Sequence, residues 1–483
     1  MPRSVYVRVV SFRFIISMVM EQPLNICPQI TYAIQLLSTG DNQDKAIGII
    51  ESVISDYDTK QYPNFSTGLA GIGAGIQYAI NQQMIEAVAD EVFVEIDEIL
   101  FLSVCFRNHY DLSHAKGLTG LASYFFYRLE DKYASDNNIC TLTSKSALLS
   151  ILDILSARVG LNGYSYPLFK KIAKLSDEEV KDIKAFIRHF FQYNICNTQA
   201  ELLQNRMIEN MYYKENASCI SANKNLDDLT ILIPVRIDST QRLENLYTMI
   251  EFYTSRTNAR FILLEAGETQ LVNITHYNHV EYIFCKDNNR IFHHTHYRNE
   301  MIKRAGTPIV AIWDIDIVVP LDQLYVAAEA IRKYGNVLSY PFDGCCYSIP
   351  EELSSKYREN PDIRLLENKH PVLSTMFGML TVGGVFLANR KQYMRAGMEN
   401  ENFVGWGPED AERLKRITIL NLPVFRVPGS IYHLWHPRKE NSCFANQEQN
   451  LKAKKELIRI CRMNSPDLQN EINTWHWLDN HNQ

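Results

Sequence analysis

The sequence is poor in the cysteine patterns that define disulfide-stabilised or zinc-binding domains. Its ten cysteines are spread through 483 residues, and no C-x-x-C pair or Cys-His dipeptide occurs. This thin spacing argues against a disulfide framework and against a zinc knuckle. We therefore expect reduced thiols, with the adjacent Cys345 and Cys346 buried, because neighbouring cysteines do not easily bridge without strain.

The chain also lacks a strong excess of charge and a long apolar run. A formal net charge of -6 gives no reason to expect a nucleic-acid partner. The apolar stretch at residues 9–20 contains Arg13 and is shorter than the roughly 20 residues that span a bilayer. No small-residue cleavage site follows it. We therefore expect no stable membrane span, and a cytoplasmic protein or one peripheral to the membrane.

The length and the apolar spacing predict more than one domain. A chain of 483 residues exceeds one ordinary domain, and hydrophobic residues at 46% are typical of a folded protein. From about Ile30 to Leu203 the apolar residues follow helical spacing. Similar Gly-Leu segments begin at Gly68 and Gly117, which are 117 - 68 = 49 residues apart. Residues 1–214 are therefore predicted to form an all-α domain of repeated helical hairpins.

One stretch of this half resembles a known family. The segment YDLSHAKGLTGLASYFFYRL and the Gly68 segment are similar to the helix starts of the lanthionine synthetase C-like family, which forms an α/α toroid. The resemblance is partial and covers roughly 150 residues. That family's cyclases hold zinc through a Cys and a Cys-His-Gly segment, and this chain has no Cys-His pair. The resemblance therefore implies the fold without the cyclase chemistry, and a domain that presents an acceptor such as a peptide.

A polar linker at residues 215–228 precedes a different pattern. Beyond it, short β-rich runs alternate with amphipathic helices, with strands expected at residues 230–235, 260–265, 281–285 and 308–314. Ser239 is placed to cap one helix, and Gly335 to end another. This alternation predicts an α/β domain with a mostly parallel sheet over residues 229–483.

Polar side chains follow each of these strands. In open α/β sheets, ligands bind beyond the carboxyl ends of the strands. Several carboxylates on one such edge would repel one another without a ligand or a cation. The residues at these positions that are candidates for donor binding are Arg236, Asp238, Glu265, Asp287 and Asp314. Asp316, which follows the last of these strands, is a candidate metal ligand.

The sharpest of these signals is Asp314-Ile315-Asp316. Side chains alternate along a strand, so a strand that ends at Trp313 is expected to place both carboxylates on one face. Such a pair suits a divalent cation that bridges to a diphosphate. A D-x-D sequence alone is weak evidence, because it also occurs in ordinary acidic loops.

Two further motifs contain candidate catalytic and metal-binding residues. In Gly405-Trp-Gly-Pro-Glu-Asp410, Trp406 offers a flat face to a sugar ring, and Glu409 and Asp410 stand where a helix begins. A carboxylate there can act as general base toward a hydroxyl, although an ordinary helix start is the alternative. In the strand-like run after residue 430, His433 is the first choice and His436 the second to complete a metal site. A structural histidine is the alternative.

These motifs together resemble one enzyme group. The segments ILIPVR, FHHTHYRNEMIKRAGTPIVAIWDID and LTVGGVFLANRKQYMRAGMENENFVGWGPEDAE are similar to β-1,4-galactosyltransferases and polypeptide GalNAc-transferases, which have the GT-A fold. The resemblance covers about 210 residues. It implies a nucleotide near Pro234, Arg236 and Asp238, and a donor sugar beside Gly383 and Gly384.

The same resemblance implies the metal and acceptor residues. Asp314, Asp316 and His433 would hold Mn²⁺, or Mg²⁺, on the diphosphate of a UDP-sugar, and imidazole favours Mn²⁺. Trp406 and Glu409 would bind the acceptor, a carbohydrate, glycolipid or peptide, and Asp410 would remove its proton. Glu409-Asp410 stands where the retaining enzymes carry Glu-Asn, which favours inversion.

The family pattern is not complete, and other functions compete with it. Pro408 and Ala411 depart from the family's acceptor loop, which puts the shape of that loop in question. One alternative is a catalytically silent module that binds carbohydrate or nucleotide. Another is a peptide-modifying protein that acts through its N-terminal half.

Overall fold

The structure is a computed structural model that describes residues 28–40, 42–56, 63–106, 109, 111–160, 175–208, 222–277, 279–369, 373–376, 378 and 380–478. The chain forms two compact units. The helical unit comprises Met1–Leu155 and Ala173–Ile195, and the sheet unit comprises Ser156–Ile172 and Cys196–Gln483. The apolar stretch at residues 9–20 and most of the expected linker, residues 215–221, lie outside the described residues.

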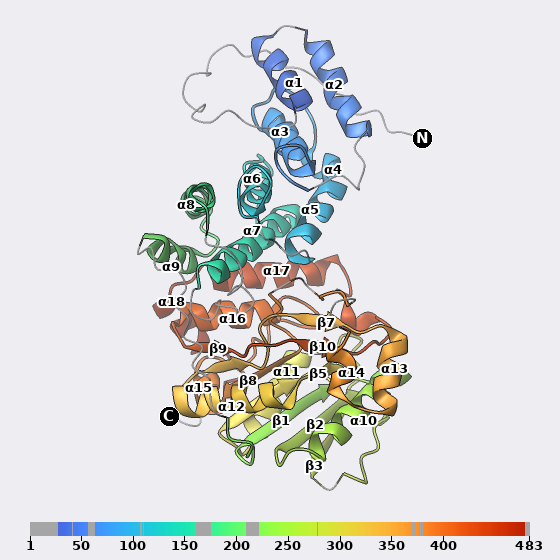
Figure 1. Ribbon diagram of the computed structural model, residues 1–483. Helices are drawn as coiled ribbons and strands as arrows, with labels where there is room; N and C mark the ends of the chain where they lie inside the picture. The colour runs from blue at the N-terminus through green and yellow to red at the C-terminus, as the bar shows by residue number, and fades with distance from the viewer. Residues whose placement is uncertain are drawn as a thin grey trace. The chain divides into compact units, whose positions relative to one another are not determined.

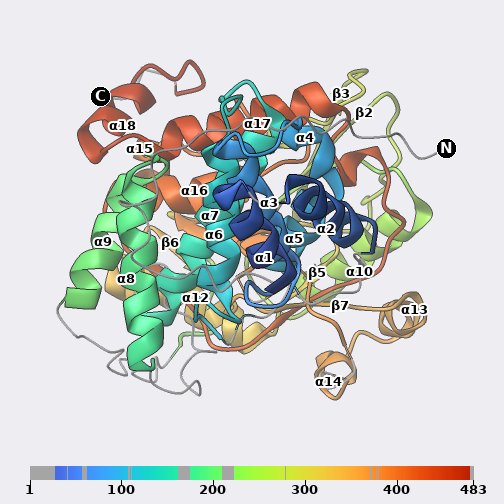
Figure 2. The same ribbon diagram turned by 90° about the horizontal axis from the view of Figure 1, so that it is seen from above.

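The described part of the helical unit contains only helices, as the apolar spacing predicts. Helix α7 (Ile139–Arg158) begins in this unit. The others are α1 (Pro28–Thr39), α2 (Gln43–Asp56), α3 (Leu69–Asn81), α4 (Ala89–Val92), α5 (Val94–Phe106), α6 (Leu118–Leu129) and α8 (Asp177–Phe191). In Figures 1 and 2, α3 and α6 lie side by side.

The 49-residue repeat has a structural counterpart in α3 and α6. Gly68 and Gly117 are their N-caps, both with extended backbone. A Cβ at Gly71 would overlap the carbonyl oxygen of Phe65, and a Cβ at Gly120 would overlap that of His114. The pair Gly71 and Phe65 and the pair Gly120 and His114 occupy equivalent places in the repeat. Glycine is needed at both places because the backbone of the loop before each helix lies against it.

By length and composition, one helix of the described chain could cross a membrane. This is α7, and 72% of its apolar window is buried within the structure. Core helices of folded proteins commonly show the same combination of length, apolarity and burial.

The sheet unit is built on a mostly parallel sheet, as the sequence predicts. Its seven strands lie in the order β3-β2-β1-β4-β8-β6-β9. Only β8 runs antiparallel to its neighbours. The strands are β1 (Leu229–Val235), β2 (Arg260–Gly267), β3 (Val280–Lys286), β4 (Ile309–Trp313), β6 (Leu338–Tyr340), β8 (Val385–Asn389) and β9 (Val424–Arg426). Every residue of the central strand β1 is buried, because the strand has neighbours on both edges and side chains packed on both faces.

A second, three-stranded sheet carries the histidine motif. Its order is β5-β10-β7, with β5 (Ile317–Val318), β10 (Ile431–His433) and β7 (Cys346–Ser348). Because β10 pairs with β5, the histidine motif lies beside the residues that follow Asp316. Two segments that are more than 100 residues apart in sequence thereby meet.

The helices of the sheet unit begin and end where local signals predict. The Ser239 side chain accepts a hydrogen bond from the Arg242 backbone N–H at the start of α10 (Thr240–Thr254). Gly335, with φ of 67°, ends α12 (Leu321–Tyr334). The remaining helices are α9 (Asn197–Ile208), α11 (His294–Arg304), α13 (Glu351–Glu359), α14 (Ile363–Glu367), α15 (Arg390–Arg395), α16 (Glu409–Ile419), α17 (Gln447–Cys461) and α18 (Ser465–Ile472).

The boundary between the units differs from the one expected at residue 214. Helix α9 belongs to the sheet unit, where it packs against α16. The buried Lys415 ammonium donates a hydrogen bond of 2.6 Å to Gln199 Oε1, which links the two helices. The spacing of apolar residues predicts that a segment is a helix, but it does not predict which unit packs against the apolar face of that helix.

Candidate active site

A cavity of about 340 Å³ lies at the carboxyl ends of β1 and β4. The parallel pairing of these strands brings their ends to one edge of the sheet. Most of the residues expected from the sequence line it: Pro234, Arg236, Asp314, Asp316, Gly383, Gly384, Trp406, Glu409, Asp410, His433 and His436.

Three expected donor-binding residues do not line this cavity. Glu265 is 1% exposed, and its carboxylate accepts hydrogen bonds from the backbone N–H groups of Leu271 and Val272. It therefore supports the loop after β2, which differs from the donor contact expected from the sequence. Asp238 accepts a hydrogen bond of 3.0 Å from Asn441 Nδ2. Asp287, the third, supports Arg236.

Arg236 is held rigidly at the edge of the cavity. Its guanidinium forms an ion pair with Asp287, and its Nε donates to the Ala266 carbonyl oxygen over 3.0 Å. Asp287 also accepts a hydrogen bond of 2.8 Å from the Tyr297 hydroxyl. The guanidinium lies over the ring of Phe292, 5.1 Å from its centroid. Asp287 therefore acts by fixing the orientation of Arg236.

The expectation that Asp314 and Asp316 share one face of a strand is wrong. Strand β4 ends at Trp313, and the chain then turns, with the Ile317 N–H donating to the Asp314 carbonyl oxygen over 3.1 Å. Alternation of side chains applies only within an extended strand. Both carboxylates line the cavity, but Asp314 faces Arg298 at 3.4 Å, whereas Asp316 faces the histidines.

Asp316, His433 and His436 form the one potential metal-binding group of three found among the described residues. One ligand atom from each lies within 4.8 Å of the others. Asp316 Oδ2 lies 3.0 Å from His436 Nε2 and 3.7 Å from His433 Nε2. The structure thus brings His436, the second choice from the sequence, closest to the carboxylate, while Asp314 stands outside the group.

The charge state of these residues suits metal binding. Burial opposes ionisation of Asp316, but His433, His436 and Arg242 together hold the pKa of its carboxyl well below the ordinary range. Burial lowers the pKa of His433, which favours the neutral imidazole that binds metals. A set of two imidazoles and one carboxylate fits Mn²⁺ better than Mg²⁺, which prefers oxygen ligands.

Glu409 lines the cavity and has one buried carboxylate oxygen without a hydrogen-bond partner in the part of the chain that the structure describes. It is 6% exposed and stands at the start of α16, where its Oε1 lies 2.9 Å from His294 Nε2. Its Oε2 is buried and has no hydrogen-bond partner among the described residues. An unpaired buried carboxylate oxygen is costly, so this atom is suited to accept a hydrogen bond from a ligand hydroxyl.

Asp410 is a half-buried carboxylate between two arginines at the cavity. Its Oδ1 accepts a hydrogen bond of 2.6 Å from Arg413 Nη2 and lies 3.7 Å from Arg298 Nη1. Burial raises the pKa of Asp410, and repulsion from Glu409 adds to this, against the attraction of Arg413. A raised pKa makes the ionised carboxylate a stronger proton acceptor.

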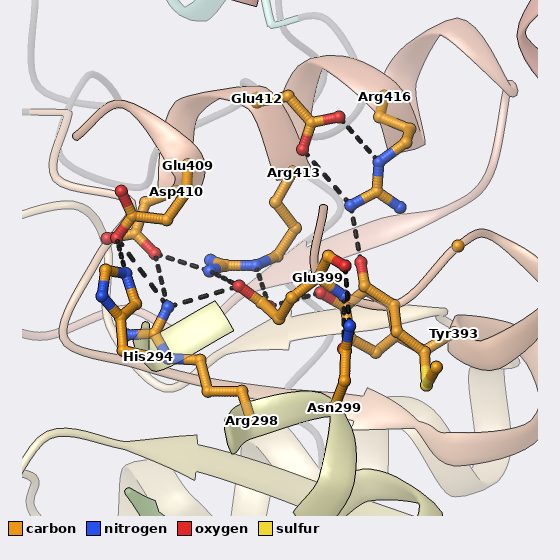
Figure 3. A network of polar contacts seen from close by, with 12 residues as sticks. His294, Arg298, Asn299, Tyr393, Glu399, Glu409, Asp410, Glu412, Arg413 and Arg416 are labelled. Carbon is orange, nitrogen blue, oxygen red and sulfur yellow. Dashed lines mark hydrogen bonds and ion pairs between the residues drawn. The ribbon is translucent and has the colours of Figure 1, made fainter. Parts of the chain in front are cut away.

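Figure 3 shows a charged network behind these two carboxylates that the sequence motifs did not reveal. No sequence motif marks a role for its members His294, Arg298, Glu399 and Arg413. The first two belong to the segment FHHTHYRNEM, so their place in α11 was the available signal. Nothing local marked Glu399, which follows α15.

The loop that carries Trp406, which the sequence resemblance assigns to the acceptor loop, is anchored to the segment that follows the histidines. Trp406 contacts Phe444 edge to face, with ring centroids 4.9 Å apart. Gln449 Nε2 donates to the Val404 carbonyl oxygen over 2.6 Å. Gly405 has φ of 75°, a conformation that favours glycine. The indole is thereby presented at the cavity despite Pro408 in the loop.

Replacing Gly383 by Ala is expected to lower turnover at least about tenfold by displacing the proposed base. A Cβ at Gly383 would overlap Asp410 Oδ2, and Arg413 holds that carboxylate in place. Steady-state kinetics would measure the effect. The matched control is Gly306→Ala, because Gly306 has no neighbour within 4 Å of a Cβ. Equal turnover in both variants would contradict the close packing of Gly383 against Asp410.

Part of this site is similar to a family of known proteins. Residues 376–440 match a family model described as the N-terminal domain of galactosyltransferase. The matched segment is less than half of the chain, and it contains Gly383, Asp410, His433 and His436. No curated protein matches the chain.

Solved structures resemble the chain only distantly. The mannosyltransferase PcManGT from Pyrobaculum calidifontis, in complex with GDP-Man and Mn²⁺, is 12% identical with a TM-score of 0.31, over 54% of this chain and 70% of that one. GalNAc-T7 with UDP, GalNAc and Mn²⁺ is 11% identical with a TM-score of 0.33, over 48% of each chain. A Drosophila β1,4-galactosyltransferase 7 variant with manganese, UDP-Gal and xylobiose is 16% identical with a TM-score of 0.29, over 46% of this chain and 77% of that one.

The family match falls on the segment that supplies Asp410 and the two histidines of the cavity. The cavity itself lies at the ligand-binding edge of a mostly parallel sheet. Over this segment the chain is similar to the N-terminal domain of galactosyltransferase.

Proposed function

We propose that this protein is a metal-dependent glycosyltransferase that moves a hexose or N-acetylhexosamine from a UDP-sugar to an acceptor hydroxyl with inversion. One observation carries the proposal. A potential metal site, Asp316 with His433 and His436, opens onto the same cavity as two carboxylates, the buried Glu409 and the half-buried Asp410. Donor activation and acceptor deprotonation need these two kinds of group on opposite sides of one sugar.

The donor would lie along the sheet edge. Pro234 and the immobilised Arg236 line the part of the cavity nearest β1, where the nucleotide would bind. Gly383 and Gly384 line the cavity beside the place proposed for the donor sugar. Mn²⁺ held by Asp316, His433 and His436 would neutralise the charge of the departing diphosphate. The Mn²⁺ and UDP complexes of GalNAc-T7 and the Drosophila galactosyltransferase are in keeping with this choice of metal and donor.

The acceptor would enter from the side of Trp406. Its ring would pack on the indole, and one of its hydroxyls would donate to the unpaired Oε2 of Glu409. Asp410 would accept the proton of the attacking hydroxyl as the bond to the anomeric carbon forms. A single displacement of this kind inverts the anomeric centre, through a transition state with oxocarbenium character.

The proposal also includes the class of acceptor and the location of the protein in the cell. We assign the helical unit the role of presenting a carbohydrate, glycolipid or peptide acceptor, and we place the protein in the cytoplasm or at the membrane surface. The absence of a Cys-His pair from the whole sequence supports a binding role for the helical unit over zinc-dependent cyclisation.

A panel of UDP-sugars tests the proposal. UDP release and sugar transfer would be measured with Mn²⁺, Mg²⁺ or EDTA, for the wild type and for Asp316→Ala. We expect release from at least one donor that depends on Mn²⁺ and is lost in the variant. No release from any donor by a folded wild-type protein would contradict the proposal and favour a catalytically silent binding module.

A further inference from the structure

Glu399 is a buried carboxylate at the centre of the charged network. It lies between α15 and the acceptor loop and is 1% exposed. Its Oε1 accepts hydrogen bonds from Arg413 Nε, over 2.9 Å, and from the Tyr393 hydroxyl, over 2.6 Å. Its Oε2 accepts from Arg413 Nη2 over 3.0 Å and from Arg298 Nη1 over 3.3 Å. Both oxygens are therefore fully used (Figure 3).

The backbone of Glu399 is fixed as firmly as its side chain. Its N–H donates to Asn299 Oδ1 over 2.9 Å, and its carbonyl oxygen accepts from Asn299 Nδ2 over 2.9 Å. Asn299 stands next to Arg298 on α11. Glu399 is thus tied to the same helix as one of the two arginines that it binds.

The two arginines that meet Glu399 also meet the carboxylates of the cavity. Arg413 reaches Asp410 over 2.6 Å, and Arg298 lies 3.7 Å from Asp410 and 3.4 Å from Asp314. Each guanidinium is therefore shared between Glu399 and the reacting side of the site. Glu399 itself does not line the cavity.

We propose that Glu399 is a positioning residue for Asp410, acting through Arg413 and Arg298. It holds both guanidinium groups at fixed places and offsets part of their positive charge, so that Asp410 keeps its orientation and its strength as a base. This inference rests on the proposed function, in which Asp410 deprotonates the acceptor.

The sign of the electrostatic effect follows from the charges that face Asp410. The negative charge of Glu399 raises the proton affinity of Asp410, whereas the two arginines lower it. Without that negative charge, the positive charge of the two arginines acts more strongly on Asp410, so Asp410 becomes a weaker base. The charged groups that act on Asp410 are Arg413 and Glu409 on α16, Arg298 on α11, Asp314 after β4, and Glu399.

Glu399→Gln tests the proposal, because it keeps the shape of the side chain and removes its charge. We expect kcat to fall about tenfold or more, with KM for the donor within about twofold of the wild type. The decline of kcat at acidic pH, which reports protonation of Asp410, should move to lower pH by about one unit. A purely structural loss would lower kcat without moving this limb of the profile.

Glu412→Gln is the matched control. Glu412 is equally buried, pairs with Arg416 over 2.8 Å, and does not line the cavity. The same chemical change there should leave kcat and the acidic limb at their wild-type values. If the wild type is active and Glu399→Gln does not shift the pH at which kcat declines, the proposal on Glu399 is overturned while the proposed function stands. A wild type that transfers no sugar would overturn the proposed function and this inference with it.

A second variant covers the case in which Glu399→Gln does not fold. Arg413→Lys keeps the positive charge but cannot bond Glu399 at two atoms and Asp410 at the same time. We expect kcat to fall about tenfold with the acidic limb near its wild-type position. Wild-type kcat in Arg413→Lys would show that Asp410 needs no such support and would overturn the proposal.

Discussion

Replacing Asp410 by Asn is expected to lower turnover by on the order of 10² or more, because the variant cannot accept the proton of the acceptor hydroxyl. Asparagine keeps the shape of the side chain and can still accept the hydrogen bond from Arg413. Donor binding should stay intact, because Asp410 is proposed to act on the acceptor. Turnover from steady-state kinetics and UDP affinity from calorimetry, with Mn²⁺ present, would separate the two effects.

The pH profile adds a second readout to this experiment. In the wild type, kcat should fall as the pH drops through the raised pKa of Asp410, because the protonated carboxyl cannot act as a base. The residual activity of Asp410→Asn should lack this limb. Asp322→Asn, at an exposed position in the first turn of α12, is the matched control and should behave as wild type. Nearly full turnover in Asp410→Asn would refute the assignment of the base.

Replacing Asp316 by Ala is expected to abolish metal-dependent transfer, a loss of at least about 10³ in turnover. The variant removes the one carboxylate of the proposed ligand set and leaves two imidazoles. EDTA should reduce the turnover of the wild type to the same level, and added Mn²⁺ should restore turnover in the wild type only. Titration calorimetry with Mn²⁺ would report the loss of the site independently of turnover.

Companion variants separate the ligand set proposed here, Asp316 with His433 and His436, from the one expected from the D-x-D motif. His433→Ala and His436→Ala should each weaken Mn²⁺ binding at least about tenfold. Asp314→Asn should weaken it less, because Asp314 faces Arg298 and stands outside the group of three. If Asp314→Asn lost Mn²⁺ as completely as Asp316→Ala, the ligand set would have to include Asp314.

The sequence by itself determined four strands of the large sheet, two helix ends and most of the residues that line the cavity. Apolar runs placed the first four strands of the large sheet, and Ser239 and Gly335 marked helix ends that the structure confirms. The 49-residue spacing located the equivalent glycines of α3 and α6. These signals are local, because side-chain periodicity and capping depend on residues only a few positions apart.

Only the tertiary structure decided how the candidates are grouped. The chain turns after Trp313, so Asp314 and Asp316 contact different side chains. The pairing of β10 with β5 brings both His433 and His436 close to Asp316. Glu399 meets Arg298 across 101 positions of the chain, and no local pattern marks that pair. The physical reason is that periodicity shows which face of an element is buried, whereas the partner on that face is chosen by long-range packing and charge.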